Sequence, residues 1–336
     1  ALSEGAVQRA LAGGRDRRPG QVRLTDETPD PAAEIARRLD ARLRTEHSAP
    51  IAIGFSGGGD SLALLLAREQ DTLLLDLAVE EPNAHLFFDV RSAGSEEVRV
   101  MLPRVEEEYC DRCGVCQDVC AFHALLVLPD RVLLFPELCK SCRGCVVLCP
   151  VGAVVDDTMR IGVVEERILP RLTVLTGRLD VGCTDVPALI RAVKSRARAQ
   201  TAANNLAATS RSTVTVIDAP PGCACAAVEA VRGADLTVLV TEPTPFGLHD
   251  LDLISQTLRA LQQRFVVLLN KAVPHDDSVQ RWCEAERVAL IGAIPLDDDV
   301  ARACARGWLL PHALPWSTPL LLESLQRMEA FAEEQV

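Results

Sequence analysis

Apolar and polar positions along the chain follow two alternating patterns. Continuous apolar runs, typical of buried parallel strands, alternate with segments in which apolar positions recur every three or four residues, as on one face of a helix. The runs that predict strands, some continuing into a turn, are 51–55, 71–79, 212–222, 235–247, 265–273 and 289–297; the segments that predict helices are 32–45, a stretch ending near Glu69, 186–199, 226–234, 248–263, 278–288 and 298–307. This alternation predicts an α/β fold with a doubly wound, mostly parallel sheet and helices on both faces.

The alternation is missing from the start of the chain and is interrupted in its middle. Residues 1–33 are rich in Gly, Arg, Pro and Asp and have no sustained apolar period, which predicts a flexible N-terminal extension. A cysteine-rich block at 110–150 interrupts the α/β pattern. We therefore expect one α/β domain built from residues 34–100 and 158–336, with a second domain inserted over residues 101–157.

The composition limits the partners and the compartment. The net charge is −12, which argues against nucleic acid as a main partner because phosphate backbones require clustered Lys and Arg. No uncharged apolar run approaches the roughly 18 residues of a membrane span, and no secretory-signal pattern is present. The odd number of cysteines, 13, argues against a disulfide scaffold. We expect a cytoplasmic protein with no membrane segment.

Eight of the cysteines form two runs with the spacing of bacterial two-cluster ferredoxins. The runs 110–120 and 139–149 each read C-x2-C-x2-C-x3-C, and Pro follows only the second run. The two short spacings let one loop supply three thiolates, and the fourth cysteine crosses to the other cluster. One predicted [4Fe–4S] cluster is held by Cys110, Cys113, Cys116 and Cys149, and the other by Cys139, Cys142, Cys145 and Cys120.

Zinc is the alternative occupant of paired C-x2-C motifs. A zinc site needs four ligands and no third x2 spacing, so the doubled pattern fits zinc poorly. Among the other cysteines, Cys283 and Cys304 lie in helical patterns and are expected to be small core residues. Cys223 and Cys225 follow a strand end, where ligands gather in open α/β sheets, and they are a candidate site for an extra metal.

A glycine-rich turn follows the first predicted strand. The segment IAIGFSGGGDSLALLLA, residues 51–67, reads as a strand, a turn and the start of a helix, a layout that surrounds a phosphate with backbone N–H groups. Its SGGGDS matches the SGGxDS loop of the PP-loop ATP pyrophosphatases, and residues 34–70 resemble the N-terminus of tRNA lysidine synthetases. This resemblance implies that the loop holds the pyrophosphate of ATP, through Ser56, Gly57, Gly58, Gly59, Asp60 and Ser61.

From about residue 72 onward the chain resembles the MinD-type P-loop ATPases that carry an inserted ferredoxin domain. The segments that carry the resemblance are LLLDLAVEEPNAHLFF, the two cysteine runs, VIDAPPG, VEAVRGADLTVLVTEPTPFGLHDL, LLNK and IGAIPLDDDVARACARG. The resemblance implies that Asp218 ends the Walker B strand and holds a water on Mg²⁺. It also implies that Asp76 is the second candidate catalytic carboxylate, that Asn270 faces the adenine, and that Pro295 lines the base pocket.

The chain departs from this family at the phosphate loop. The family reads GKGGTGKTT where residues 54–62 read GFSGGGDSL, so Phe55 and Asp60 replace two lysines and only Ser61 keeps its role as a potential Mg²⁺ ligand. Ala78 replaces the second carboxylate of the family's Asp-x-Asp pair. A carboxylate in place of a cation changes two units of charge, each worth about 4 kcal/mol at ~4 Å from a phosphate with an effective dielectric of about 20. We therefore expect weak or absent ATP hydrolysis.

These observations lead to one leading hypothesis and three alternatives. The leading hypothesis is a MinD-like electron-transfer or cluster-handling protein with two [4Fe–4S] clusters, with ATP and Mg²⁺ as its further cofactors. It would act with a redox partner protein, as a homodimer or beside an active paralogue. The first alternative is a PP-loop enzyme that adenylates a substrate, as lysidine synthetases and some [4Fe–4S] thiolases do. The others are a scaffold that hands over metal through Cys223 and Cys225, and a fused reading frame with no selected function as a whole.

Overall fold

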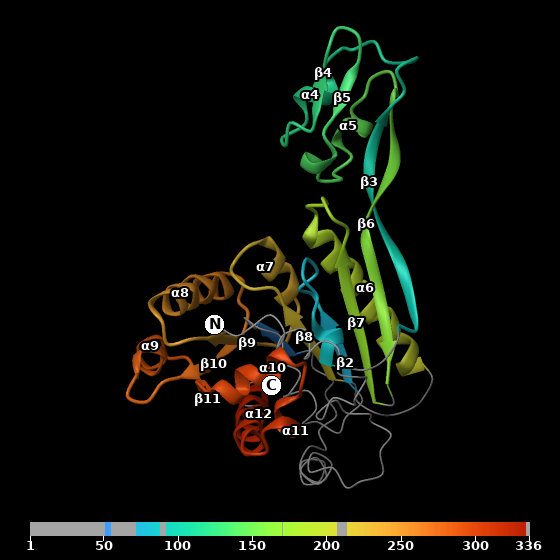
Figure 1. Cartoon of the computed structure of the whole chain (residues 1–336). Helices are drawn as coiled ribbons and strands as arrows, with labels where there is room; N and C mark the ends of the chain where they lie inside the picture. Colours follow the sequence, from blue (N-terminus) through green and yellow to red (C-terminus); the bar gives the residue numbers. More distant parts are fainter. Residues whose placement is uncertain (1–50, 55–71, 88–91, 170, 207–213, 334–336) are drawn as a thin grey trace, which may run out of the picture.

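A nine-stranded sheet forms the centre of the molecule. The computed structural model describes residues 51–54, 72–87, 92–169, 171–206 and 214–333. The strand order is β11-β10-β9-β1-β8-β2-β7-β6-β3 (Figure 1). The strands are β1 (Ile51–Gly54), β2 (Thr72–Asp76), β3 (Gly94–Val105), β6 (Val154–Ile168), β7 (Leu172–Leu179), β8 (Val214–Ala219), β9 (Leu236–Thr241), β10 (Phe265–Ala272) and β11 (Leu290–Pro295).

Most of this sheet is parallel. Every pairing from β11 across to β7 is parallel, whereas β6 runs antiparallel to both β7 and β3. The prediction of a mostly parallel α/β sheet is confirmed. The antiparallel edge made by β6 and β3 was not predicted, because its half-exposed strands lack the continuous apolar runs of buried strands.

Helices cover both faces of the sheet, as predicted. One face packs on α6 (Val186–Leu206), α7 (Cys225–Val231), α8 (Pro245–Ala260) and α9 (Ser278–Glu286), and the other on η1 (Ala84–Phe87), α10 (Asp298–Ala305), α11 (Leu310–Ala313) and α12 (Ser317–Glu333). Consecutive residues of β2 enter opposite cores: Leu73 and Leu75 face the first set of helices, and Leu74 faces the second. Cys283 is buried in the first core, as expected. Among the described helices, none has both the length and the apolarity needed to cross a membrane.

The β3–β6 ribbon carries the cysteine-rich residues away from the sheet (Figure 1). Residues 162–168 of β6 pair with β7, but residues 154–160 pair with β3 alone. At the far end lies a small module of α4 (Val115–Asp118), β4 (Leu125–Val127), β5 (Val132–Leu134), η2 (Pro136–Leu138) and α5 (Gly144–Val147). The expected domain boundaries near 101 and 157 fall inside β3 and β6, so these two strands continue across both boundaries.

A buried lysine connects α6 to α7. The Lys194 side chain is 7% exposed, and its Nζ donates hydrogen bonds to the carbonyl oxygens of Glu229, Ala230 and Arg232 at 2.8, 3.0 and 2.6 Å. These carbonyls lie at the C-terminal end of α7, where a helix leaves its last acceptors without internal partners. Lys194 therefore caps α7 and fixes it against α6.

Removing this amine should destabilise the fold. We expect Lys194→Met to lower the free energy of unfolding by about 2 kcal/mol, because it keeps the aliphatic volume and takes the donor away from three carbonyl oxygens at the end of α7, of which that of Ala230 is buried. Urea unfolding at pH 7 measures the change. Arg191→Met is the matched control, since Arg191 lies on the same helix, is 55% exposed and makes only a 3.7 Å ion pair with Glu229. Equal stability of the two variants would contradict the capping role.

Candidate functional site

The two cysteine runs have matching backbone conformations. Three positions in each run adopt positive φ angles. They are the residue before the second cysteine, the residue after it, and the third residue after the last cysteine. The matching pairs are Arg112 and Ser141 (57° and 55°), Gly114 and Arg143 (85° and 63°), and His123 and Gly152 (52° and 67°). Positive φ is uncommon for side chains with a Cβ. Four of these six positions carry such side chains, so the loop geometry itself is what the two runs have in common.

This backbone geometry suits an anion. Right- and left-handed conformations in succession turn neighbouring N–H groups toward the inside of a loop, which is the geometry of backbone anion sites, iron–sulfur sites among them. The residues at 114 and 143 are the N-caps of the short helices α4 and α5. Each helix contains the third cysteine of its run, Cys116 or Cys145, and both side chains are buried. Each run therefore combines three left-handed positions with a short helix that contains its third cysteine.

The first predicted ligand set comes together in the structure. One cavity in the module is lined by all four of its cysteines, Cys110, Cys113, Cys116 and Cys149, although Cys149 belongs to the second run. Burial raises the pKa of the Cys116 thiol, and the neighbouring thiols of Cys110 and Cys113 raise it further. Cys149 thus lines the same cavity as three cysteines of the other run, and its assignment to their cluster stays a prediction.

The second set is gathered less completely. Burial raises the pKa of Cys145 to about 11, and the thiols of Cys139 and Cys142 also raise it, so these three side chains are neighbours. The Sγ of Cys120 accepts a hydrogen bond from the N–H of Ala124 at 3.3 Å. The assignment of Cys120 to the second cluster stays a prediction.

A single metal ion has no ready site in the described ranges. No group of three or more His, Cys, Asp or Glu side chains there is arranged around one point. A zinc ion requires four ligand atoms within about 2.3 Å of its centre. A cubane cluster makes a different demand, since each thiolate binds a different iron at a different corner.

Two carboxylates meet at the other candidate site, at the carboxyl end of the parallel strands. Asp76 ends β2 and stands in register with Asp218, the penultimate residue of β8. Both are buried, at 0% and 3% exposure. Asp76 Oδ2 accepts the N–H of Ala84 at 3.1 Å, whereas its Oδ1 has no partner among the described residues. The carboxyl ends of parallel strands are where ligands bind in open α/β sheets.

Burial sets the protonation of this pair. It raises the pKa of Asp76 to about 6, against the opposing effect of backbone hydrogen bonds from the segment that begins η1. It raises the pKa of Asp218 well above the usual range, and the nearby charge of Asp76 raises it further. A bound divalent cation would favour the ionised forms of both groups. The pair can therefore hold a proton or sit beside a cation.

The remaining predicted residues lie at the same edge of the sheet or outside the described part. The loop residues 56–61 lie outside it. Asn270 is buried near the end of β10, and its side-chain oxygen accepts the N–H of Lys271 at 2.9 Å. Pro295 ends β11 and pairs with Ala272 of β10. The structure thus brings Asn270 and Pro295 to neighbouring strands and separates them from Asp218 by β9 and β1.

Cys223 and Cys225 lie just after β8, in the turn that leads to α7, and both thiols are exposed. Neither belongs to a metal-binding group in the portion of the chain that the structure describes. Cys223 instead lines a cavity between this turn and α8. Their role as an extra metal site therefore stays a proposal, and further ligands would have to come from a partner molecule or from residues outside the described part.

Sequence reasoning missed the threonines of the sheet. Thr176 on β7 stands in register with Asp76, is fully buried, and its hydroxyl has no partner among the described side chains and backbone groups. It lengthens the buried polar row from Asp218 through Asp76. A threonine inside an apolar strand is a weak signal, because threonine also suits strands for its β-branched shape.

Comparison with known proteins finds two uncharacterized relatives that match most of the chain and one short match to an oxidoreductase subunit. No family model matches the chain. It is 27% identical over 279 residues to the uncharacterized protein MJ0578 of Methanocaldococcus jannaschii, a match that covers 83% of this chain and 93% of that protein. It is 24% identical over 229 residues to the uncharacterized protein MJ0579 of the same organism, covering 64% and 79%. A short match, 37% identical over 57 residues, links 17% of this chain to 9% of the indolepyruvate oxidoreductase subunit IorA of Methanothermobacter marburgensis.

Similar solved structures include cell division ATPases. The cell division ATPase MinD of Pyrococcus furiosus has a TM-score of 0.49 at 14% identity and covers 85% of this chain and 100% of its own. MinD of Pyrococcus horikoshii in complex with Mg-ADP has a TM-score of 0.48 at 15% identity, covering 86% and 99%. A ParA family ATPase from Chlorobium tepidum has a TM-score of 0.46 at 13% identity, covering 84% and 98%.

Proposed function

We propose that this chain is an iron–sulfur protein built on a nucleotide-binding type of α/β fold, and that it transfers electrons or handles clusters with weak or absent ATP hydrolysis. The observation that carries the proposal is the pair of C-x2-C-x2-C-x3-C runs with matching left-handed positions. The spacing alone is that of two-cluster ferredoxins. Matching backbones support two sites of one kind within a single module.

The chain's own residues would perform three tasks at these sites. Cys110, Cys113, Cys116 and Cys149 would hold one cluster, and Cys139, Cys142, Cys145 and Cys120 the other. Leu125 and Val154 form a small apolar core with Cys116 and Cys145, and this core would keep water from the inner side of the two clusters. The β3–β6 ribbon presents the module away from the main sheet (Figure 1). When bound, such clusters supply one-electron transfer, and exposed placement favours exchange with a redox partner.

The nucleotide part of the proposal rests on Asp60. A carboxylate at the position of the Walker lysine repels a polyphosphate where the lysine would attract it. Asp218 and Asp76 remain in place at the strand ends, so a cation could still be held there. We propose that the chain pairs with a second copy or with an active paralogue that supplies hydrolysis.

Restoring the lysine tests this role of the loop. We expect the wild-type protein, loaded anaerobically with its clusters, to bind Mg-ATP weakly, and Asp60→Lys to tighten binding by at least about 100-fold, since two units of charge change sign beside the phosphates. Equilibrium dialysis with labelled ATP measures both affinities. Asp130→Lys, the same change at an exposed turn of the cysteine module, is the control. Tight binding by the wild type that Asp60→Lys weakens would contradict the proposal.

That contradictory result would favour the second candidate, a PP-loop enzyme that adenylates a substrate. The specific observation in its favour is the SGGGDS match at residues 56–61. The products of labelled ATP separate the two functions. AMP and pyrophosphate, lost in Asp60→Asn and Ser61→Ala, indicate adenylation, whereas ADP and phosphate indicate a Walker-type ATPase. The leading proposal expects neither pair in quantity.

A further inference from the structure

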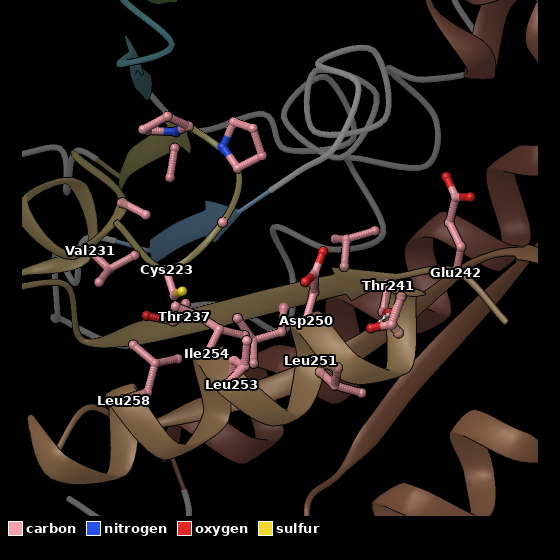
Figure 2. Close-up of a pocket in the computed structure, with 18 of the residues that line it drawn as sticks. Cys223, Val231, Thr237, Thr241, Glu242, Asp250, Leu251, Leu253, Ile254 and Leu258 are labelled. Atoms are coloured by element: carbon pink, nitrogen blue, oxygen red, sulfur yellow. Dashed lines mark hydrogen bonds between the residues drawn. The ribbon is translucent and has the colours of Figure 1, made fainter. Parts of the chain in front are cut away.

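A cavity of about 340 Å³ lies between β9, α8 and the turn that joins β8 to α7 (Figure 2). Its walls are mostly apolar and come from all of these elements. The buried apolar residues among them include Ala227 and Val231 of α7, Leu239 of β9, and Leu251 and Leu258 of α8. Pockets for small molecules have this size and composition, with a few polar groups that fix orientation.

One polar group in the wall has no partner. Thr237 of β9 lines the cavity, is 0% exposed, and its hydroxyl makes no hydrogen bond within the described residues. A buried hydroxyl without a partner is unfavourable, and Val would fill the same space without that penalty. Thr241 lies at the end of the same strand and differs from Thr237, because its hydroxyl donates a hydrogen bond to the carbonyl oxygen of Gly247 at 2.9 Å. The Thr237 hydroxyl is closed off in the structure, so a polar group inside the cavity reaches it only when the Thr237 side chain or a neighbouring side chain shifts.

The charges at the cavity select against anions. Among the described residues, its lining includes two acidic residues, Glu242 and Asp250, and no Lys or Arg. Figure 2 shows Glu242 toward one end of the cavity, Thr237 and Cys223 toward the other, and Asp250 between them. Glu242 is paired with Lys271 Nζ at 2.5 Å, whereas Asp250 is exposed. A negatively charged ligand would meet this uncompensated carboxylate, so an uncharged ligand fits better.

The end of the cavity near α8 is rigid. Thr244 caps α8 by accepting the N–H of Gly247 at 3.0 Å. A Cβ on Gly247 would approach the carbonyl oxygen of Glu242 to 2.4 Å, so the first turn of α8 lies as close to the end of β9 as glycine permits. The cavity is therefore a formed feature of the fold on this side.

We propose that this cavity binds an uncharged small molecule with an apolar body and one hydrogen-bonding group, a carbonyl or hydroxyl, that pairs with the Thr237 hydroxyl. The apolar body packs against α7 and α8, and the polar group lies at the Cys223 end. This site lies outside the cysteine module. It begins one residue after Asp218, since Ala219 and the turn that follows it line the cavity.

Three matched probes test the proposal on the full, cluster-loaded chain: 4-phenylbutan-2-one, butylbenzene and 4-phenylbutanoate. Titrations followed by saturation-transfer NMR should show the ketone binding about five-fold more tightly than butylbenzene, as one neutral hydrogen bond predicts. The carboxylate should bind at least about ten-fold more weakly than the ketone. Failure of all three to bind, or equal binding of the carboxylate, would overturn the proposal.

Variants show where the probes bind. Thr237→Val should abolish the tighter binding of the ketone and leave the affinity for butylbenzene unchanged. An equal effect on both affinities would mean that the ketone does not bond to the Thr237 hydroxyl, and it would contradict the proposal. Ala227→Leu should fill the cavity and weaken both probes by at least about ten-fold. Ala260→Leu, an exposed position of α8 outside the cavity, is its control. Unchanged affinity in Ala227→Leu would show that the probes bind elsewhere and would overturn the proposal.

Discussion

Alanine at Cys145 and Cys149 together should remove all cluster iron, whereas alanine at Cys116 and Cys149 together should leave about half of it. Each double variant removes two of the eight cysteines. The difference follows from the crossing of the fourth cysteine: Cys149 shares a cavity with Cys110, Cys113 and Cys116 rather than with the cysteines of its own run. The first variant damages both predicted clusters, and the second damages one of them twice.

Iron and acid-labile sulfide per chain, measured after anaerobic reconstitution, give the result directly. Cys223→Ala with Cys225→Ala is the control for loss of two thiols, since both are exposed and lie outside the module. It should keep all the iron of the two clusters and lose only labile extra metal, if the turn after β8 holds any. The opposite ranking of the two double variants would show that each run keeps its own fourth cysteine.

The second large effect is expected at Asp76. Its pKa is raised from 3.8 to about 6 in the folded protein, chiefly because the carboxyl is buried. A raised pKa means that the folded state holds a proton that the unfolded state has released. The neutral carboxyl therefore contributes stability that is complete below about pH 3.8 and is lost as the pH rises through about 6. The loss amounts to about 3 kcal/mol at most.

Asp76→Asn should remove this dependence. Its amide oxygen can still accept the N–H of Ala84, while no charge has to be buried at neutral pH. We expect the variant to unfold at higher urea concentration than the wild type at about pH 7.5, and the difference to shrink toward about pH 4.5. Added Mg²⁺ should stabilise only the wild type, if the cation binds beside the carboxylates.

Asp130→Asn, the same substitution at an exposed position of the cysteine module, is the matched control. An Asp76→Asn variant less stable than the wild type at about pH 7.5 would mean that the ionised Asp76 is favourable in the fold. That result would mean that the positive charge of Arg167, which lowers the pKa of Asp76, outweighs the effect of burial, and it would contradict the raised pKa.

Periodicity located the elements that are buried on both faces. The strands β8, β9, β10 and β11 and the helices between them match the predicted segments, because a buried parallel strand must be apolar along its length. The strands β3, β6 and β7 were not predicted, although β7 is buried on both faces like the strands that were. β3 and much of β6 are exposed on one side and mix charges with apolar residues, and β3 and β6 gain their stability from pairing with each other.

The candidate sites also differ in how much of each could be predicted from local sequence. The cysteine runs could be read from spacing, since their ligands are close in sequence and their loop geometry is local. The contact between Asp76 and Asp218 depends on β2 lying beside β8, which joins residues 142 positions apart in the chain (218 − 76). The unpaired hydroxyl of Thr237 depends on packing between β9 and α8, which no local pattern reports.

Native mass spectrometry of the anaerobically reconstituted full chain decides whether the cysteine module holds two clusters. We expect a mass increase equal to two four-iron, four-sulfide units on one chain, about eight iron and eight sulfide in total, without further metal after gel filtration. A wild-type chain that carries zinc ions without sulfide would contradict the two-cluster proposal. So would a wild-type chain that carries only one cluster and keeps it when the cysteines of the first run are replaced by alanine.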